Sequence, residues 1–305
     1  MSRVLLTGST GFIGRHTLAA LVRGGHEVHA VARRRGPDTH GVRWHEADLL
    51  ESADVVEQIE PEILVHLAWY AEHGKFWSSV ENLRWVEASL ALLRAFARAG
   101  GRRAVVAGTC AEYGWSRELY AEDAPLQPAT LYGAAKHGLH VVSRAFAEQA
   151  GISLAWGRVF FLYGPFESPG RFVPSIVRPL LLGEPAPMTD GTQRRDLMHA
   201  ADVGAAFAAL ADSPVTGAVN VASGSAAVLR DVARRIAREL DAGELLLLGA
   251  RPVPAGEPPA LLADVGRLRE EVGWSPAIEL DDGLSEVIEW WRERLAAGAS
   301  REGTS

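Results

Sequence analysis

The stretch ATLYGAAKHG, residues 129–138, places Tyr132 four residues before Lys136. Residues four apart on a helix share one face, so the phenol and the ammonium can meet there. Such a pair is either part of an ordinary amphipathic surface or a phenol whose acidity the neighbouring cation increases. The spacing alone leaves both interpretations open.

A second group with chemical potential is the glycine-rich stretch LLTGSTGFIG, residues 5–14, in which Gly8, Gly11 and Gly14 are spaced three apart. It ends the first expected strand and begins the first expected helix. In such a loop the glycines provide a tight turn, room for a pyrophosphate against the backbone, and close packing of helix on strand. Free N–H groups at the helix start then face the anion. The motif predicts dinucleotide binding.

The end of the second expected strand, EVHAVARRR, bears on which dinucleotide binds. An NAD site has a carboxylate there for the ribose hydroxyls, whereas the 2′-phosphate of NADP requires a cation. This chain has Ala32 at the carboxylate position, followed by Arg33. NADP(H) is therefore favoured and NAD(H) remains possible, because Arg33 to Arg35 could also form a solvated basic turn.

The elements that must position these residues alternate along residues 1–165. Short runs rich in β-branched residues are followed by amphipathic stretches, which predicts right-handed crossovers and a parallel sheet covered on both faces. We therefore expect an α/β fold with a Rossmann-type doubly wound parallel sheet. The expected strands are RVLLT (3–7), VHAVA (28–32), ILVHLA (63–68), RAVVAG (103–108) and LAWGRVFF (154–161), and the expected helices include GFIGRHTLAALVRG (11–24) and VENLRWVEASLALLRAFARAG (80–100).

The alternation loosens after Pro165, where prolines divide the chain into short pieces. The strand-like AVNVAS (218–223) and LLLLGA (245–250) then flank the helix-like VLRDVARRIAREL (228–240). We expect a smaller, interleaved C-terminal lobe. The predicted organisation is a dinucleotide-binding domain in 1–165 with parts of about 195–225 returning to it, a mainly substrate-binding lobe in 166–295, and a disordered tail in 296–305.

Composition excludes several classes of function. Of the 305 residues, 48% are hydrophobic and 23% are charged, as in globular proteins, and the formal charge of -7 disfavours general nucleic-acid binding. The start of the sequence shows no targeting segment and no run of eighteen apolar residues occurs, so we expect a cytoplasmic protein without membrane association. Cys110 is the only cysteine, which excludes an internal disulfide framework and a cysteine-based metal site.

Over nearly its whole length the sequence resembles the extended short-chain dehydrogenase/reductases, a family of nucleotide-sugar epimerases, dehydratases and ketoreductases. The resemblance is specific because many short motifs occur in the family's order and spacing. They are TGSTGFIG (7–14), ADLL (47–50), VHLA (65–68), GTCAEYG (108–114), YGAAK (132–136), YGP (163–165), RRDLMHAADV (194–203) and EEVGWSP (270–276).

The resemblance implies a role for each matching residue. Thr109, Tyr132 and Lys136 fit the family's catalytic set, which decides the question left open by the spacing of the last two. The implied cofactor-binding residues are Gly8, Gly11, Phe12, Ile13, Gly14, Arg33, Asp48, Leu49, Leu67, Ala68, Trp69, Asn82, Tyr132, Lys136 and Phe160. The implied substrate-binding residues are Cys110, Ala111, Phe161, Arg171, Arg195 and Arg251, although these three arginines are equally typical of surface ion pairs.

The chemistry of such a set is proton donation to a carbonyl that receives a hydride. Hydride transfer leaves negative charge on the oxygen, which therefore needs a donor of matched pKa. A free phenol, with a pKa near 10, is too weak an acid at neutral pH. An ammonium about 4 Å away at an effective dielectric near 20 contributes roughly 4 kcal/mol, or about three pKa units. We therefore expect Lys136 to lower the pKa of Tyr132, and Thr109 to orient the carbonyl oxygen.

Departures from the family's motifs narrow the activity. Family 4,6-dehydratases have an Asp-Glu pair directly after the catalytic Thr, but this chain has Cys110 and Ala111, and Glu112 would point to the other face of an extended strand. Phe161 replaces the substrate-binding Asn that epimerases usually have before YGP. We therefore expect an NADPH-dependent ketoreductase acting on a nucleotide-linked keto-deoxysugar, with a 4-epimerase that retains NAD(P) as the alternative and a non-catalytic dinucleotide sensor as a third.

Three further features carry expectations. Asn82 belongs near the site by analogy, although it also fits a helix cap. Trp69, Tyr70, Phe76 and Trp77 form either a lid that narrows the pocket or ordinary core and interface aromatics. His137 and His140 lie three apart, but no acidic or thiol partner accompanies them in the sequence, so we expect no metal.

Finally, the helices expected around 81–99 and 131–150 are apolar on more than one face. This pattern suggests a partner, and the resemblance implies a homodimer joined by a four-helix interface. The prominent apolar residues are Trp85, Leu92, Phe96, Leu139, Val142 and Phe146.

Overall fold

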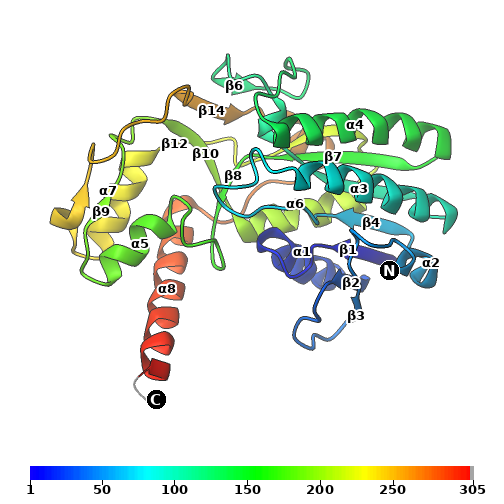
Figure 1. Ribbon diagram of the computed structural model, residues 1–305, viewed down its shortest axis with the longest axis horizontal. Coiled ribbons are helices and arrows are strands. Elements are labelled where there is room, and N and C mark those ends of the chain that lie inside the picture. Colours follow the sequence, from blue (N-terminus) through cyan, green and yellow to red (C-terminus); the bar gives the residue numbers. More distant parts are fainter. Residues whose placement is uncertain (303–305) are drawn as a thin grey trace.

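A seven-stranded parallel sheet lies at the centre of the fold (Figure 1). The structure is a computed structural model that describes residues 1–302, with side chains described through residue 297. All neighbouring strands of this sheet pair in parallel, as the alternation of strands and helices predicts. In spatial order the strands are β11 (Gly217–Val221), β7 (Ser153–Val159), β5 (Arg103–Thr109), β4 (Ile63–His66), β1 (Arg3–Thr7), β2 (Glu27–Ala32) and β3 (Val42–Glu46).

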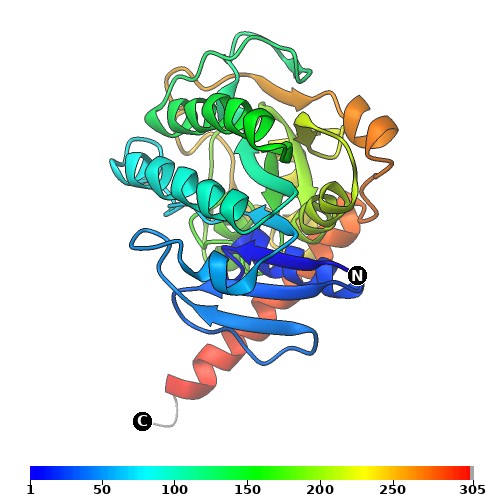
Figure 2. The ribbon, with the colours of Figure 1, turned by 90° about the vertical axis from the view of Figure 1, so that its right-hand side faces the viewer.

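Helices cover both faces of this sheet (Figures 1 and 2). Successive residues of a strand point to opposite faces, so Val4 and Leu6 pack with one helical layer and Leu5 packs with the other. The α/β doubly wound fold is therefore confirmed. One layer contains α1 (Phe12–Arg23) and α6 (Ala200–Asp212), and the other contains α3 (Glu81–Arg98) and α4 (Leu131–Ala150), with α2 (Val55–Ile59) beside α3.

The five strands expected in residues 1–165 are all present. One further strand of the large sheet, β3, and the short strands Leu119–Tyr120 and Phe161–Tyr163 were missed. The β3 sequence VRWHE has only two apolar residues, Val42 and Trp44, because it forms the half-exposed edge of the sheet. The expected strand LLLLGA is shorter than predicted. Only Leu246–Leu247 pairs there, because the run follows a 3-10 turn and meets a two-residue partner.

The smaller lobe lies at one end of the sheet, on the left of Figure 1. Strand β10 (Arg194–His199) is central to it and pairs with β8, β12 and β14. The other strands are β6 (Leu119–Tyr120), β8 (Phe161–Tyr163), β9 (Ala186–Pro187), β12 (Ala226–Val228), β13 (Leu246–Leu247) and β14 (Ala260–Ala263). The helices are α5 (Pro174–Leu181), α7 (Leu229–Glu239) and α8 (Leu280–Glu302), and the short turns of the chain are η1 (Cys110–Glu112), η2 (Gly243–Leu245) and η3 (Arg267–Glu271).

The chain crosses between the two parts more than once. After β10 it returns to the large sheet, where α6 packs on α1 and β11 pairs with β7. In the segment 296–305, which was expected to be disordered, α8 continues through Glu302. Residues 303–305 lie outside the described residues.

The apolar residues that suggested a partner for α3 and α4 are distributed differently from the expectation. Leu92, Phe96 and Leu139 are fully buried in the core of the chain itself, because the sheet face lies beneath them. Of the six residues named from sequence, Val142 is half exposed. Leu83 of α3 and Val141 of α4 are also exposed. Among the described helices, none is long and apolar enough to cross a membrane.

Candidate active site

The glycine loop between β1 and α1 has the close backbone packing that its motif predicts. Gly8 has a φ of 69°, and a Cβ placed on it would lie 2.8 Å from the nitrogen of Ala68. A Cβ on Gly14 would lie 1.9 Å from the Gly8 carbonyl oxygen. The N-cap Gly11 provides no side-chain acceptor and the first turn of α1 contains no acid. The N–H groups at this helix start are therefore available to an anion such as a pyrophosphate.

A cleft of about 310 Å³ runs from this loop across the carboxyl ends of the central strands. Such an edge is where doubly wound sheets bind their ligands. The cleft brings together Arg171 and most of the residues predicted to bind the cofactor. They are Gly8, Gly11, Phe12, Ile13, Gly14, Arg33, Asp48, Leu49, Leu67, Ala68 and Trp69.

The end of β2 presents Ala32 and Arg33 to this cleft, and no carboxylate of that strand lines it. Arg33 is exposed, whereas the neighbouring Arg35 pairs with Asp38. On the other side of the cleft, one Asp48 oxygen accepts a hydrogen bond from the Leu50 N–H at 3.0 Å. The adenosine end therefore combines a cationic side chain with a pre-formed Asp turn.

Thr109 ends β5 and caps the 3-10 turn η1. Its Oγ1 accepts from the N–H of Ala111 at 3.2 Å, while the Glu112 carboxylate accepts from the Thr109 N–H at 2.9 Å. This reciprocal arrangement is a capping box. Because Oγ1 accepts the backbone N–H, its own proton can be donated to a neighbouring oxygen.

The start of α4 is packed directly against this turn. A Cβ on Gly133 would lie 2.3 Å from the Ala111 carbonyl oxygen, so only glycine permits the approach. Thr130 caps the helix by accepting from the Gly133 N–H, and the Tyr132 N–H donates to the Trp77 carbonyl at 3.1 Å. The helix start thereby places Tyr132 beside Thr109, whose hydroxyl favours the ionised phenol.

Tyr132 does not have the lowered pKa expected from the sequence. Burial raises its pKa to about 12, and Lys136 is not among the groups that act on it. Three aromatic rings around Tyr132 exclude water from the phenol. Their centroids lie 4.9 Å (Phe76), 5.8 Å (Trp77) and 6.5 Å (Trp69) from the centroid of the Tyr132 ring. The phenol is therefore protonated at neutral pH in the chain by itself.

Lys136 lies one turn further along α4 and is buried. Its Nζ donates to the Ala107 carbonyl at 2.9 Å and lies 3.7 Å from the Trp69 ring centroid. Burial lowers its pKa to about 7, while the charge of Glu112 acts in the opposite direction. The same burial, with the nearby Lys136 charge, lowers the pKa of His66 to about 3, so this histidine is neutral beneath the site.

Asn82 is buried at the start of α3 and connects the aromatic residues rather than capping its own helix. Its Nδ2 donates to the carbonyls of Phe76 and Ser79, and its Oδ1 accepts from Trp69 Nε1 at 2.9 Å. Phe76 is buried and Trp77 is 39% exposed. Phe76, Trp77 and Trp69 lie around Tyr132, and the hydrogen bond to Asn82 holds Trp69 in place. Asn82 itself does not line the cofactor cleft.

The residues predicted to bind substrate fall into separate places. Cys110 and Ala111 follow Thr109 directly, and burial raises the pKa of the Cys110 thiol to about 12. The guanidinium of Arg195 lies 5.3 Å from the Phe161 ring centroid and pairs with Glu257. Arg195 is thus buried in an ion pair rather than free to meet an anion.

Two predicted residues are placed away from the site. The Phe160 side chain is buried in the core against Tyr113, so it does not line the cofactor cleft. Arg251 is exposed on the loop after β13, where its N–H donates to the Met188 carbonyl. The predicted roles of Phe160 and Arg251 fail for the same reason. A position close to a motif in the sequence does not determine where the side chain points.

Two buried acids near the site were missed or discounted at the sequence level. Glu112 was assigned to an extended strand, but it lies in η1 and its carboxylate is fully buried. Glu167, shortly after YGP, is 4% exposed, and burial raises its pKa to about 8 while the charge of Arg171 lowers it. No pattern in the sequence distinguishes either acid from a surface residue.

Glu112 is also the acidic partner that His137 and His140 lack in the sequence. One possible ligand atom from each of the three lies within 4.8 Å of the others. The Glu112 carboxylate, however, already pairs with Arg158 at 3.1 Å. A metal ion there would compete with this guanidinium for the same oxygen.

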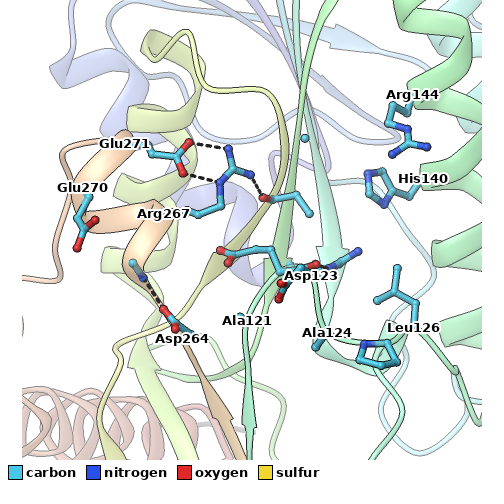
Figure 3. Close-up of a pocket in the computed structure, with 16 residues that line it drawn as sticks. Ala121, Asp123, Ala124, Leu126, His140, Arg144, Asp264, Arg267, Glu270 and Glu271 are labelled. Carbon is cyan, nitrogen blue, oxygen red and sulfur yellow. Dashed lines mark hydrogen bonds and ion pairs between the residues drawn. The ribbon is translucent and has the colours of Figure 1, made fainter.

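A second, more open cleft of about 920 Å³ lies behind β5 and β7 and shares no lining residue with the cofactor cleft (Figure 3). His140 and Arg144 of α4 line one side of it, and Arg267, paired with Glu271, lines the other. Its lining is rich in acids and is distant from the glycine loop in sequence and topology. Thr109, Tyr132 and Lys136 line neither cleft, but Trp69, which lines the smaller one, contacts both Tyr132 and Lys136.

Known proteins are similar to the chain over most of its length. The family model described as NAD dependent epimerase/dehydratase family matches residues 4–222. The chain is 27% identical to UDP-glucuronic acid decarboxylase 1 of Xenopus tropicalis, over 98% of this chain and 74% of that protein. It is 29% identical to UDP-glucose 4-epimerase of Corynebacterium glutamicum, over 97% of each. The solved structure of MoeE5 in complex with UDP-glucuronic acid and NAD shares 31% identity and a TM-score of 0.84, covering 96% of this chain and 99% of that chain.

Proposed function

The chain belongs to the NAD dependent epimerase/dehydratase family, and from this premise we propose that it reduces the keto group of a nucleotide-linked deoxysugar with NADPH. The observation that carries the choice of cofactor is Arg33, which lines the adenosine end of the cleft where an NAD-specific site would have a carboxylate. The observation that favours reduction is Phe161, which stands where epimerases usually have a substrate-binding Asn.

The residues of the cleft fit a nicotinamide dinucleotide. The N–H groups at the start of α1 would hold the pyrophosphate, Asp48 and Leu49 would border the adenine, and Arg33 would meet a 2′-phosphate. The space next to Gly8, Gly11 and Gly14 is closed to any Cβ, so the backbone itself forms this surface. When bound, the dinucleotide supplies the hydride.

The chain's own residues would manage the proton and the orientation of the sugar. Thr109 would donate its free hydroxyl proton to the carbonyl oxygen and fix its direction. Tyr132 would transfer a proton to that oxygen as negative charge develops on it. Burial raises the pKa of this phenol to about 12, so it is protonated at neutral pH, and efficient transfer requires that the pKa falls when cofactor and substrate bind.

The positions after Thr109 argue against water loss from the sugar. Ala111 has no proton to transfer, and the Cys110 thiol, with its pKa raised to about 12, is a poor acid and a poor base at neutral pH. A 4,6-dehydration or a decarboxylation assisted by an acid at these positions is therefore disfavoured.

The second candidate is a nucleotide-sugar 4-epimerase that retains its cofactor. It is favoured by the similarity to UDP-glucose 4-epimerase of Corynebacterium glutamicum and to MoeE5, which binds NAD and UDP-glucuronic acid. Epimerisation begins with oxidation and needs the phenolate form of Tyr132, so it requires a cofactor-induced lowering of that pKa.

We propose that Arg171, at the cleft, contacts the substrate, and that Arg195 does so after leaving Glu257. The exposed Leu83, Val141 and Val142 on α3 and α4 support a homodimer through these two helices. Light scattering of the purified protein measures its mass in solution, and a Val142→Asp variant that changes this mass supports the helical interface.

One incubation separates the activities. Purified protein is mixed with NADPH and a nucleotide 4-keto-6-deoxysugar, and absorbance near 340 nm is followed, where the reduced nicotinamide absorbs. Stoichiometric loss of absorbance supports the ketoreductase. Isomerisation of a nucleotide sugar without net cofactor consumption supports the epimerase, and cofactor binding without turnover of either substrate contradicts both.

A further inference from the structure

Glu112 is a fully buried carboxylate that the proposed chemistry does not itself use. It lies at the end of η1, directly behind Thr109, and the first turns of α4 pack against the same short helix. Its environment is built from three elements, since β5, β7 and α4 all contribute neighbours. A buried charge held in this way requires partners for its oxygens.

Both oxygens of this carboxylate have strong donors. Oε1 accepts from the Thr109 N–H at 2.9 Å and from Trp156 Nε1 at 2.8 Å, and Oε2 accepts from Arg158 Nε at 3.1 Å. Three donors, one of them a guanidinium, give the carboxylate one orientation. The His140 ring stacks on Trp156 and closes the remaining side.

The first consequence concerns the geometry of Thr109. The Glu112 hydrogen bond holds the Thr109 N–H on the side of the strand away from the cleft. The Ala111 N–H donates to one lone pair of Thr109 Oγ1. Together these contacts fix the backbone and side chain of Thr109 at the start of η1, beside Tyr132.

The second consequence concerns the charge of Lys136. The neighbours of the ammonium are the Trp69 ring, the Ala107 carbonyl and the neutral His66. None of these three carries a negative charge that would offset the loss of water around the ammonium. The charge of Glu112 raises the pKa of Lys136, and it is the one titratable group that does so among the described residues. The same charge raises the pKa of Tyr132, which keeps the phenol protonated.

We propose that Glu112 is a positioning residue for this site: its carboxylate anchors the backbone of Thr109, and its charge acts on Lys136 of the helix that packs against η1. The role in turnover rests on the proposed function. The effect on Lys136 does not, because it concerns the chain by itself.

Other titratable groups near Glu112 lie on β7, on α4 and in the open cleft. Arg158 of β7 pairs with Glu112, His140 Nδ1 lies 4.0 Å from Glu112 Oε2, and His137 lies one turn before His140 on α4. Behind them the open cleft of Figure 3 adds Arg144. Burial, with Arg158 and Arg144, lowers the pKa of His140 to about 3, so His140 stays neutral across the range in which Lys136 titrates. The remaining acids of that cleft are Glu122, Asp123, Asp264, Glu270 and Glu271.

Tyr132 is faced by its own set of groups. Arg171 lowers its pKa, and Cys110 and Glu112 raise it. Because the Cys110 thiol is neutral at neutral pH, Glu112 is the charge whose removal is expected to change the site most. A variant that removes this charge and preserves the side-chain size therefore isolates the effect.

The chain is suited to a direct measurement because Lys75 and Lys136 are its only lysines. Lysine labelled with carbon-13 at Cε gives one NMR signal from each. Lys75 is exposed and pairs with Glu72, so its signal serves as an internal control. The titration is recorded on the full chain without cofactor or substrate, for the wild type and for Glu112→Gln and Glu112→Asp.

In Glu112→Gln we expect the Lys136 inflection to fall by about one pH unit relative to the wild type, with Lys75 unchanged. In Glu112→Asp, which retains the charge on a shorter side chain, we expect the inflection to stay near its wild-type value. An unchanged Lys136 inflection in Glu112→Gln overturns the proposal. So does an equal fall in both variants, because a general loosening of the structure would produce it.

Glu112→Gln leaves Arg158 without its buried partner and can fail to fold. The double variant Glu112→Gln/Arg158→Met removes both charges, which buried pairs tolerate better than the loss of one. Arg158 is not among the groups acting on Lys136, so the same fall in the Lys136 inflection is expected. A double variant with an unshifted inflection contradicts the proposal in the same way.

The anchoring role is read from turnover. Glu112→Asp is expected to lower kcat about tenfold with little change in KM, because the shorter carboxylate no longer reaches the Thr109 N–H. An unchanged kcat overturns the anchoring role. If the wild type turns over no nucleotide sugar, the proposed function fails while the lysine titration still decides the effect of the Glu112 charge.

Discussion

The indole ring of Trp69 lies over the Lys136 ammonium, with Nζ 3.7 Å from the ring centroid. Trp69 is held there by the hydrogen bond from its Nε1 to Asn82. This arrangement of the ammonium over the ring face is a cation–π contact. It removes water from the ammonium and places a large ring where a bound nicotinamide ribose would approach.

Trp69→Ala tests this relationship. Burial is the largest cause of the lowered Lys136 pKa, so opening the site to water should raise that pKa by about one unit or more. The lysine NMR titration measures it. Trp77→Ala is the matched control, because Trp77 packs on Tyr132 and not on Lys136. An equal shift in both variants would show that the contact with the indole is not the cause.

Tyr132→Phe removes the proposed proton donor and keeps the ring that packs against Phe76 and Trp77. Loss of a general acid costs roughly 10²–10⁴-fold in rate. We expect kcat to fall by at least about 100-fold, with NADPH affinity within about twofold of wild type. Steady-state kinetics measures kcat, and calorimetry measures the affinity for NADPH. A kcat near the wild-type value would exclude Tyr132 as the donor.

Arg33→Ala tests the choice of cofactor. If Arg33 meets the 2′-phosphate, its removal should weaken NADPH binding by about tenfold or more and leave NADH binding nearly unchanged. Arg35→Ala is the control, since the Arg35 guanidinium is already paired with Asp38. Tighter binding of NADH than of NADPH by the wild type would instead favour the NAD-dependent alternative.

Gly14→Ala places a methyl group 1.9 Å from the Gly8 carbonyl oxygen, which requires the phosphate-binding loop to move. We expect loss of measurable cofactor binding and a lower melting temperature. Gly138→Ala is matched to it, because that helical position in α4 has no atom within 4 Å of the added Cβ. It should raise stability by up to about 1 kcal/mol. Retained cofactor affinity in Gly14→Ala would exclude the close loop as the binding surface.

The lowered pKa of Lys136 also predicts a pH-dependent stability. Below about pH 7 the lysine is charged in both the folded and the unfolded chain, so the full cost of burying the charge is present. Between about pH 7 and the ordinary lysine value the folded chain loses the proton first, and stability rises with pH. Lys136→Met should therefore stabilise the protein by about 2 kcal/mol near pH 6, and the gain should shrink toward pH 10. Urea unfolding at both pH values measures it, and a gain that grows with pH would contradict the burial of a charged lysine.

Much of the scaffold could be predicted because its signals are local. The strand β1, the glycine loop and α1 are contiguous in sequence, so apolar periodicity and glycine spacing specify them together. The polar edge strand β3 could not be predicted this way, because its order comes from pairing with β2. For the same reason LLLLGA was overestimated, since a run of leucines does not provide a partner strand.

The candidate site divides along the same line. Thr109, Tyr132 and Lys136 sit in short motifs that resemble those of the family, and this resemblance predicts the chemistry that we propose. The protonation states of these groups could not be predicted, since they depend on Trp69, Phe76 and Glu112, which reach the site from other elements. The sequence by itself therefore determined the α/β scaffold and the glycine loop between β1 and α1, and it indicated the candidate reacting groups. Only the tertiary structure decided that Tyr132 is held protonated, that Arg195 is paired with Glu257 and that Glu112 lies behind Thr109. Desolvation and charge act through space, between residues that the chain order keeps far apart.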